Sequence, residues 1–164
     1  MNTREILRAI FAGDTHKIDA FLEAGLDVNA KTEGDNWNFL HRALVSVTRA
    51  ADPSMIEHLV KRGVDVNARD SHMWTPLHFA ARLKNVEAMR ILLDGGAEID
   101  PINDEGATPL RLTLLSLPLD LGATGFLLSR GANANLEIDG CSVRRLAETL
   151  AHGENVGLKD LFRD

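Results

Sequence analysis

The sequence predicts an all-α solenoid of helix–turn–helix units, and two recurring phrases are the observations that predict it. The first is a six-residue phrase that begins at Gly25, Gly63, Gly96 and Gly131, so that successive copies are 38, 33 and 35 residues apart. The second is a helix-start phrase that recurs between these copies. A period of this length is typical of solenoids, in which each unit buries its apolar face by stacking on its neighbours. Because solenoids present extended surfaces, the pattern favours a binding protein over an enzyme.

The helix-start phrase predicts the first helix of each unit. It reads Trp-Thr-Pro-Leu-His-Phe-Ala-Ala at 74–81, and looser copies are found at 37–43, 107–113 and 141–147. Threonine, serine or asparagine is a favourable N-cap, and proline at the next position fits the first helical turn. The leucine and alanine positions that follow are spaced at helical intervals and form an apolar stripe.

A second short helix is predicted before each glycine phrase. It covers 55–60 in the second unit and 86–93 in the third. Gly63 and Gly96 follow these helices at the position where a left-handed residue is favoured. The Asp- and Asn-rich stretch after each glycine is typical of a turn that leads to the next unit.

The phrase Thr-Pro-Leu-His-x-Ala-Ala at 75–81, followed by Leu-Leu-x-x-Gly-Ala at 92–97, resembles the ankyrin repeat, and the resemblance covers nearly the whole chain. It implies an ankyrin-repeat solenoid with projecting β-turn or hairpin fingers and about five repeats, caps included. The single domain 1–164 is expected to divide into an N-terminal capping repeat 1–33, repeats 34–70, 71–103 and 104–136, and a C-terminal capping repeat 137–164. Atypical terminal repeats are expected, because they end the apolar stack in water.

Two of the expected repeats carry insertions. The second repeat has four extra residues between Ala43 and Leu59, which predict a longer first helix or a bulged turn that stops before Pro53. The fourth repeat has two extra residues in the apolar segment 115–122. That segment either covers the hydrophobic end of the stack or forms an exposed ridge for a partner or for dimerisation.

The fourth repeat also departs from the family pattern within its helix-start phrase. Arg111 stands where the family usually has histidine, and Thr113 stands where it usually has alanine. Both changes predict weaker local packing, so we expect this repeat to be the least stable of the array.

Composition limits the class of protein and of partner. The 164 residues are 45% hydrophobic and 26% charged, with a formal net charge of −6. This acidity disfavours nucleic acid, which needs a basic stripe, and suits a partner protein with a basic surface, although modest acidity is also an ordinary solubility feature. No apolar run is long enough to span a bilayer, and the charged N-terminal residues do not form a secretory signal. We therefore expect a cytoplasmic protein that is monomeric when free and has no membrane partner.

No catalytic, cofactor or metal site is predicted. The sequence lacks a nucleophile elbow, a phosphate-binding loop, a dinucleotide fingerprint and a zincin motif, and segment 103–106 lacks most ligands of a calcium loop. Cys141 is the only cysteine, which excludes an internal disulfide, and it is expected to be an inert, partly buried thiol in a turn. The ankyrin resemblance implies a structural role for His41 and His78, whose rings are expected to hydrogen-bond the backbone of a turn.

The resemblance also implies that a partner binds to the fingers and to the concave face lined by the first helices. Trp37 and Trp74 are the only tryptophans, and they occupy the same slot of neighbouring repeats. They are either anchors for a partner, since tryptophan is among the strongest hot-spot residues, or packing residues that join neighbouring fingers. The other candidate partner-binding residues are Asp35, Arg49, Ser71, His72, Arg82, Asp104, Glu105 and Leu115.

Acidic residues gather at the predicted finger tips: Glu33, Asp35, Asp70, Asp104, Glu105, Glu137 and Asp139. They are either ordinary solvated turn residues or a negative rim that steers a basic partner. We therefore expect a non-catalytic protein-binding module. The finer hypothesis is an immunity-type inhibitor that neutralises a basic toxin or enzyme by occluding its active-site cleft. The alternative is a scaffold or regulatory adaptor, or an effector, that binds several cellular proteins.

Overall fold

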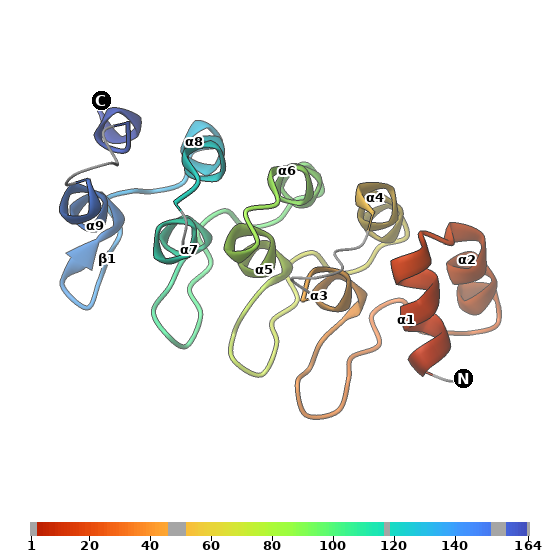
Figure 1. Ribbon diagram of the computed structural model, residues 1–164. Coiled ribbons are helices and arrows are strands. Elements are labelled where there is room, and N and C mark those ends of the chain that lie inside the picture. Colours follow the sequence, from red (N-terminus) through yellow and green to blue (C-terminus); the bar gives the residue numbers. More distant parts are fainter. Residues whose placement is uncertain (1–2, 46–51, 117–118, 152–156, 164) are drawn as a thin grey trace.

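Helix pairs stack side by side in a row in the computed structural model, which describes residues 3–45, 52–116, 119–151 and 157–163 (Figure 1). The helices are α1 Thr3–Ala12, α2 Thr15–Glu23, α3 Phe39–Leu44, α4 Pro53–Lys61, α5 Pro76–Arg82, α6 Val86–Asp94, α7 Pro109–Leu115, α8 Leu121–Ser129, α9 Val143–Leu150 and the short 3-10 helix η1 Lys159–Phe162. The odd-numbered helices form an inner row, and the even-numbered helices with η1 form an outer row. This arrangement confirms the predicted all-α solenoid.

The predicted cap residues begin the inner helices. The side-chain oxygen of Asn38 accepts hydrogen bonds from the backbone N–H groups of Leu40 and His41 at the start of α3. The hydroxyl of Thr108 accepts from the N–H of Arg111 at the start of α7. A proline follows the threonine cap of both α5 and α7. The caps of α3 and α7 satisfy N–H groups that have no partner within the helix. At the start of α5, the hydroxyl of Thr75 instead lies 3.0 Å from Nδ1 of His78.

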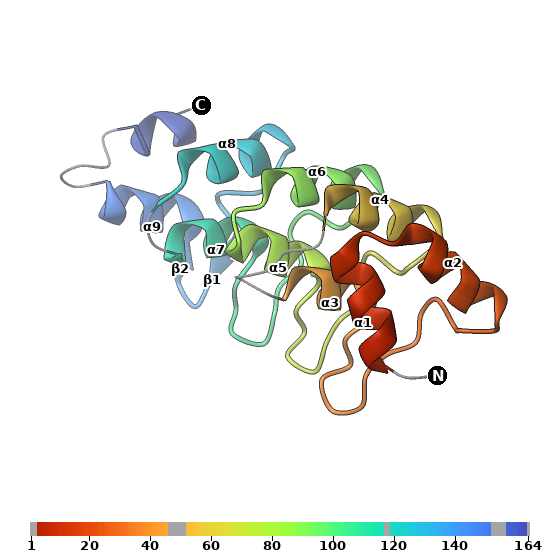
Figure 2. The same ribbon diagram turned by 45° about the vertical axis from the view of Figure 1, so that its right-hand side comes forward.

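Four fingers project from one edge of the stack, below the inner row in Figure 1 and along the same edge in the turned view of Figure 2. We name them finger 1 (24–38), finger 2 (62–75), finger 3 (95–108) and finger 4 (130–142). The glycine that opens the repeated phrase in each finger has φ between 85° and 92°. This left-handed conformation is the one predicted for the residue after a helix, and glycine adopts it without steric cost.

The first three fingers each close with one backbone hydrogen bond. The bond of finger 2, for example, runs from the N–H of Asp70 to the carbonyl of Trp74 at 2.9 Å. Finger 4 instead contains a two-stranded antiparallel hairpin, in which β1 (Glu137–Ile138) pairs with β2 (Cys141–Ser142). The thiol of Cys141 is partly buried, as predicted. The predicted turn at this residue is wrong, because its backbone pairs with Ile138 and Cys141 therefore lies in β2.

Neighbouring fingers are joined at their bases by the asparagine of the repeated phrase. Asn29 Oδ1 accepts from the N–H of Asp65 at 2.8 Å, and Asn67 Oδ1 accepts from the N–H of Glu98 at 2.8 Å. In the third copy of the phrase, the carboxylate of Asp100 accepts from the N–H of Asn133 instead. The repeated phrase therefore positions each finger against the next through the same hydrogen bond.

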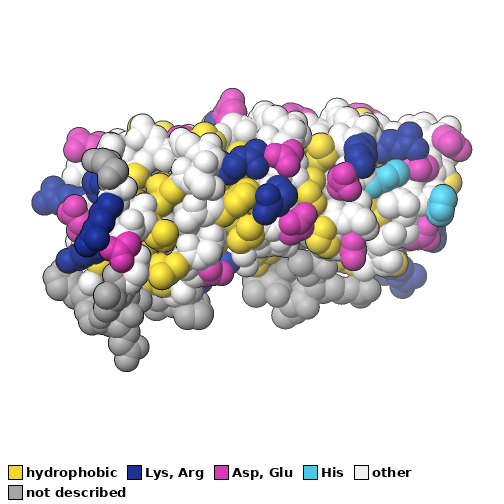
Figure 3. Space-filling model, turned by 90° about the horizontal axis from the view of Figure 1, so that it is seen from above, with side chains coloured by type: hydrophobic (Ala, Val, Ile, Leu, Met, Phe, Trp, Pro, Cys, Tyr) yellow, Lys and Arg dark blue, Asp and Glu magenta, His cyan; other side chains and the backbone are white. Residues whose placement is uncertain are grey.

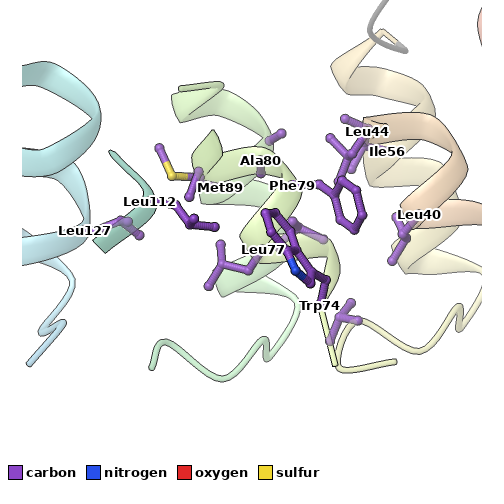
Figure 4. Packing of buried hydrophobic residues seen from close by; sticks show 14 of the residues in the cluster. Leu40, Leu44, Ile56, Trp74, Leu77, Phe79, Ala80, Met89, Leu112 and Leu127 are labelled. Atoms are coloured by element: carbon purple, nitrogen blue, oxygen red, sulfur yellow. The ribbon is translucent and has the colours of Figure 1, made fainter. Parts of the chain in front are cut away.

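The hydrophobic core runs along the whole stack, between the inner and outer rows. Leu40, Leu77 and Leu110 occupy the same slot of successive inner helices and are fully buried, as are Ile56 and Met89 from the outer row. Figure 4 shows these rows meeting, with Phe79 directed toward the preceding helix pair and Trp74 packed beside it. Each pair therefore buries its apolar face against its neighbours, as expected for a solenoid.

The insertion in the second repeat does not lengthen the first helix of that repeat. Helix α3 ends at Leu44, and residues 46–51 lie outside the described part of the chain. Helix α4 begins at Pro53, two residues before the predicted start at 55, and the side chain of Asp52 accepts from the N–H of Ser54 there. In the fourth repeat, Leu119 packs against the core.

The outer helix α8 is apolar on all its faces, unlike the amphipathic α4 and α6. The C-terminal segment accounts for part of this composition, because η1 packs on α8 and the side chain of Leu161 lies over Gly125. Figure 3 shows the face above the outer row, where charged side chains of both signs are interspersed with hydrophobic ones. Among the described residues, every helix is too short or too polar to cross a membrane.

Candidate protein-binding surface

His41 and His78 link α3 and α5 to the fingers that follow them. The Nε2 atoms of the two rings lie 3.0 Å from the backbone carbonyls of Trp74 and Ala107, respectively. On the other side of the His78 ring, Nδ1 accepts from the backbone N–H of Thr75. Burial lowers the pKa of both rings, that of His78 to about 4, so both are neutral at pH 7 and Nε2–H donates. The predicted structural role of these histidines is confirmed.

An aromatic cluster lies where fingers 1 and 2 meet α5. Phe79 packs edge-on against Trp37, with 6.2 Å between ring centroids, and lies 5.2 Å from Trp74. The guanidinium of Arg82 stands over the rings of both Trp74 and Phe79, at 5.0 and 5.1 Å from their centroids. Cation–π contacts of this kind hold the arginine side chain against the cluster.

A hollow of about 320 Å3, the inter-finger hollow, opens over this cluster. Its lining residues are Trp37, Val45, Asp70, His72, Trp74, Phe79, Arg82 and Glu105. Five of the predicted site residues, Trp37, His72, Trp74, Arg82 and Glu105, therefore lie around one concavity. Trp74 is buried, with 8% of its surface exposed, whereas Trp37 is only half-buried. Of the two indoles that line the hollow, that of Trp37 is therefore the more accessible to a partner.

Asp70 does not belong to the negative rim that the sequence predicted, because it is buried with only 7% of its surface exposed. Its Oδ1 accepts from the backbone N–H groups of His72 and Trp74, both at 2.8 Å. Its Oδ2 accepts from the indole N–H of Trp37 at 3.1 Å. The carboxylate therefore fixes the backbone of finger 2 and links finger 2 to finger 1. Its three hydrogen-bond donors compensate the cost of burying its negative charge.

The other six acidic residues of the predicted rim are exposed: Glu33, Asp35, Asp104, Glu105, Glu137 and Asp139. Asp104 contacts His72, with Oδ2 2.9 Å from Nδ1, and this hydrogen bond raises the pKa of the histidine. The pair joins finger 2 to finger 3. At pH 7 the tips therefore carry a largely negative surface on both sides of the inter-finger hollow.

The remaining predicted site residues are distributed along the edge of the stack. Ser71 is exposed at the tip of finger 2, where its N–H donates to the carbonyl of Asp35 in finger 1. Leu115 ends α7 and is 53% exposed, but it does not line the inter-finger hollow. Arg49 lies outside the described residues.

Phe79 lines the hollow but was not selected from the sequence, whereas Val45, which also lines it, is one of the first-helix ends that the ankyrin resemblance assigns to the presented surface. Phe79 occupies the variable position of the helix-start phrase, between His78 and Ala80. An aromatic residue at that position, in the repeat that also contains Trp74, is the signal that identifies it. Val45 follows α3 directly, at the edge of the insertion.

The described residues contain no group of histidine, cysteine or acidic side chains arranged to hold a metal ion. The loop that faintly resembled a calcium site is the turn of finger 3. Asn103 Oδ1 accepts from the backbone N–H groups of Glu105 and Ala107, as Asp70 does in finger 2. Its buried Nδ2 has no hydrogen-bond partner among the described residues.

Comparisons with known proteins find the same repeat. A family model described as "Ankyrin repeats (3 copies)" matches residues 44–138. The chain is 37% identical over 100 residues to the transient receptor potential cation channel subfamily A member 1 homolog of Caenorhabditis elegans, covering 60% of this chain and 8% of that protein. It is 31% identical over 100 residues to human protein phosphatase 1 regulatory subunit 27, covering 61% of this chain and 62% of that protein. The chain thus spans less than two thirds of the length of these relatives.

Proposed function

Because this chain belongs to the ankyrin-repeat family, we propose that it is a non-catalytic module that binds another protein through the inter-finger hollow and the finger tips around it. The observation that carries the proposal is the concavity itself, in which the half-buried Trp37 lies beside Arg82 and Glu105. Tryptophan and arginine are the residues most enriched among binding hot spots, and hot spots lie in concave, well-packed pockets. Their positions are rigid, because Trp37 is held by Asp70 and Arg82 rests on two aromatic rings.

A partner with a basic surface suits this site. The exposed carboxylates of Asp35, Asp104 and Glu105 flank the hollow on fingers 1 and 3. Charges placed at the rim of an interface accelerate association and select the partner, while the centre supplies most of the affinity. An immunity-type inhibitor, which occludes a basic active-site cleft of a toxin or enzyme, is the finer form of the proposal. It predicts one dedicated partner bound at nanomolar affinity or tighter.

The alternative is a scaffold or regulatory adaptor, or an effector, that binds several cellular proteins. The similarity to human protein phosphatase 1 regulatory subunit 27, named for a regulatory role, favours this alternative. It predicts several partners, each bound more weakly, and no inhibition of a single enzyme.

Affinity capture followed by mass spectrometry tests the proposal with charge-reversal variants of the exposed rim. The double variant Asp35→Lys/Glu105→Lys is expected to lose the captured partner, since it replaces rim attraction by repulsion. Replacing Trp74 is unsuitable as a test, because that side chain is buried and its loss would disturb folding.

The matched control is Glu57→Lys/Glu87→Lys, which makes the same charge change at exposed positions of α4 and α6 on the outer row. A partner that is retained by the control and lost by the rim variant supports the proposed surface. A partner retained by both variants, or lost by both, contradicts it. The number and stoichiometry of the proteins lost separates the inhibitor from the adaptor.

A further inference from the structure

A second and larger hollow lies on the other side of Trp37, between α1 and finger 1. This N-terminal hollow has a volume of about 520 Å3. Its lining residues are Ile6, Leu7, Leu26, Ala30, Lys31, Thr32, Glu33, Asp35, Trp37, Phe39 and Arg42. Six of these residues are apolar and five are polar or charged. Among the apolar ones, Leu7, Leu26 and Trp37 keep part of their surface exposed. Trp37 is the one lining residue that this hollow shares with the inter-finger hollow, so we treat the two as separate.

The backbone of finger 1 has an unused hydrogen-bond donor on this side. Ser71 of finger 2 donates its N–H to Asp35 O of finger 1, and Asp104 of finger 3 donates to His72 O of finger 2. Both donors lie three residues before the slot of the tryptophan, and the corresponding residue in finger 1 is Gly34. Within the described part of the chain, the N–H of Gly34 donates to no acceptor. The space around its Cα is also open, so another backbone can approach it closely.

Finger 1 has an underused acceptor as well. The carbonyls of Trp74 and Ala107 each accept two hydrogen bonds, one from within the finger and one from the histidine of the preceding inner helix. The carbonyl of Trp37 accepts the bond within the finger, from Thr32 N–H, but no histidine reaches it. A carbonyl oxygen has two lone pairs, so this one retains capacity for a second donor.

Leu7 explains why the second bond is missing. The N–H of Asp14 donates to Ala9 O at the end of α1, and the N–H of Asn85 donates to Ala80 O at the end of α5. When the two helices are aligned on these equivalent bonds, Leu7 occupies the position of His78. A leucine side chain packs but cannot donate, so the slot that links the later repeats is here an apolar wall of the hollow. The first repeat thus lacks the link and leaves a cavity beside the finger.

We propose that the N-terminal hollow binds an extended segment of a partner protein, which inserts one apolar side chain between Leu7 and Trp37 and hydrogen-bonds the backbone of finger 1 at Gly34 N–H and Trp37 O. The segment occupies the place that a preceding finger would have beside finger 1. Backbone bonds to an open edge supply affinity, and a side-chain pocket supplies specificity, as in other complexes formed by strand addition. Glu33 and Asp35 are balanced in the lining by Lys31 and Arg42, so the segment is recognised by its backbone and its apolar anchor and not by its charge. This proposal rests on the proposed protein-binding function and adds a second contact to it.

A displayed library of short random peptides, selected on the folded protein, tests the inference without a known partner. We expect the enriched peptides to share one large apolar residue within an extended segment. Hydrogen–deuterium exchange should show protection of the Gly34 amide when a selected peptide is bound. Two variants probe the wall: Leu7→Glu places a charge in the apolar pocket, and Leu7→His restores the donor that bonds the finger carbonyl in later repeats. Each is expected to weaken binding by about tenfold or more.

Leu7→His also guards against a folding artefact, because it is expected to preserve or raise the stability of the domain while it removes the free acceptor. The control variant Glu87→Lys, at an exposed position of α6, should leave peptide binding unchanged. Glu105→Lys alters the inter-finger hollow and not the N-terminal hollow, so it tells which of the two hollows a peptide occupies. Peptides that bind Leu7→His as tightly as the wild type, protection that avoids Gly34, or failure to enrich any peptide would each overturn the inference. Peptides lost only in Glu105→Lys would overturn it too, but they would leave the proposed function standing.

Discussion

The third and fourth repeats share one frame but differ in what holds them together. In the third repeat, His78 on α5 donates to Ala107 O of finger 3. In the fourth, Arg111 occupies the same slot on α7 and, within the described residues, makes no side-chain hydrogen bond to finger 4. Thr113, which replaces the usual alanine, is fully buried, and its hydroxyl oxygen lies 2.9 Å from that of Thr124 on α8.

The difference shows that a repeat can exchange a bond to its neighbour for a bond within itself. The sequence predicted that Arg111 and Thr113 weaken the packing of the fourth repeat. The hydroxyl of Thr113 is satisfied, however, because it also donates to Leu110 O at 2.8 Å. What the fourth repeat lacks is the histidine link to the next finger, and finger 4 has its own β1–β2 pairing instead.

The largest effect is expected when the histidine link of the third repeat is removed. His78→Ala leaves the buried N–H of Thr75 without its acceptor and opens a cavity, so the free energy of unfolding should fall by about 2–4 kcal/mol. Arg111→Ala changes the same slot of the fourth repeat and should cost less than about 1 kcal/mol. Urea denaturation followed by circular dichroism measures both. Equal losses of unfolding free energy in the two variants would show that the residues at these two equivalent positions stabilise their repeats equally.

The same comparison should appear in the pH dependence of stability. Burial lowers the pKa of His78 to about 4 from the ordinary 6.5. Between these two pH values, the imidazole is therefore protonated in the unfolded chain and neutral in the folded chain. Stability from this group is complete above pH 6.5 and is lost as the pH falls toward 4; the loss by pH 5 is about 2 kcal/mol. Denaturation at pH 7.5 and pH 5 should show this loss reduced in His78→Gln but unchanged in Arg111→Gln. A wild-type slope that survives in His78→Gln would contradict the assignment.

A smaller effect is expected for the threonine pair of the fourth repeat. Thr113→Val removes one hydroxyl at nearly constant volume and should lower the free energy of unfolding by about 1 kcal/mol. Thr124→Val should cost a similar amount, and the double variant less than the sum of the two, since they share one hydrogen bond. Additive losses in this double-mutant cycle would mean that the two hydroxyls do not interact.

The smallest effect is expected at Leu115, which is 53% exposed at the end of α7. Leu115→Gln should change the free energy of unfolding by less than about 0.5 kcal/mol. It should also leave partner capture unchanged if the inter-finger hollow is the binding surface. Loss of the partner from this variant, with stability intact, would move the interface to the apolar segment of the fourth repeat.

Local sequence predicted much of the fold because its signals act over a few residues. Threonine caps, the prolines after them and the left-handed glycines each satisfy a local backbone requirement, so helix starts and stops could be placed directly. Pro53 shows the limit of this approach. Proline is compatible both with the end of one element and with the start of the next, and only the cap by Asp52 decides between them.

The candidate site was less accessible to prediction, because burial depends on which residues approach from other repeats. Trp37 and Trp74 occupy equivalent slots, yet Phe79 and Arg82 cover Trp74 while Trp37 remains half-buried. Asp70 was indistinguishable in sequence from the exposed acidic residues of the tips. One of the three donors that compensate its burial is the indole N–H of Trp37, which lies 33 positions away in the chain.

The sequence by itself determined the repeat, its period and the backbone conformation of its turns, because each copy repeats the same short-range interactions. Only the tertiary structure decided which side chains are open to a partner. Stacking places finger 1 between α1 on one side and finger 2 with α5 on the other, and a hollow remains on either side of Trp37. A single position, Leu7 in the histidine slot, then leaves the carbonyl of Trp37 without the second donor that the carbonyls of Trp74 and Ala107 have.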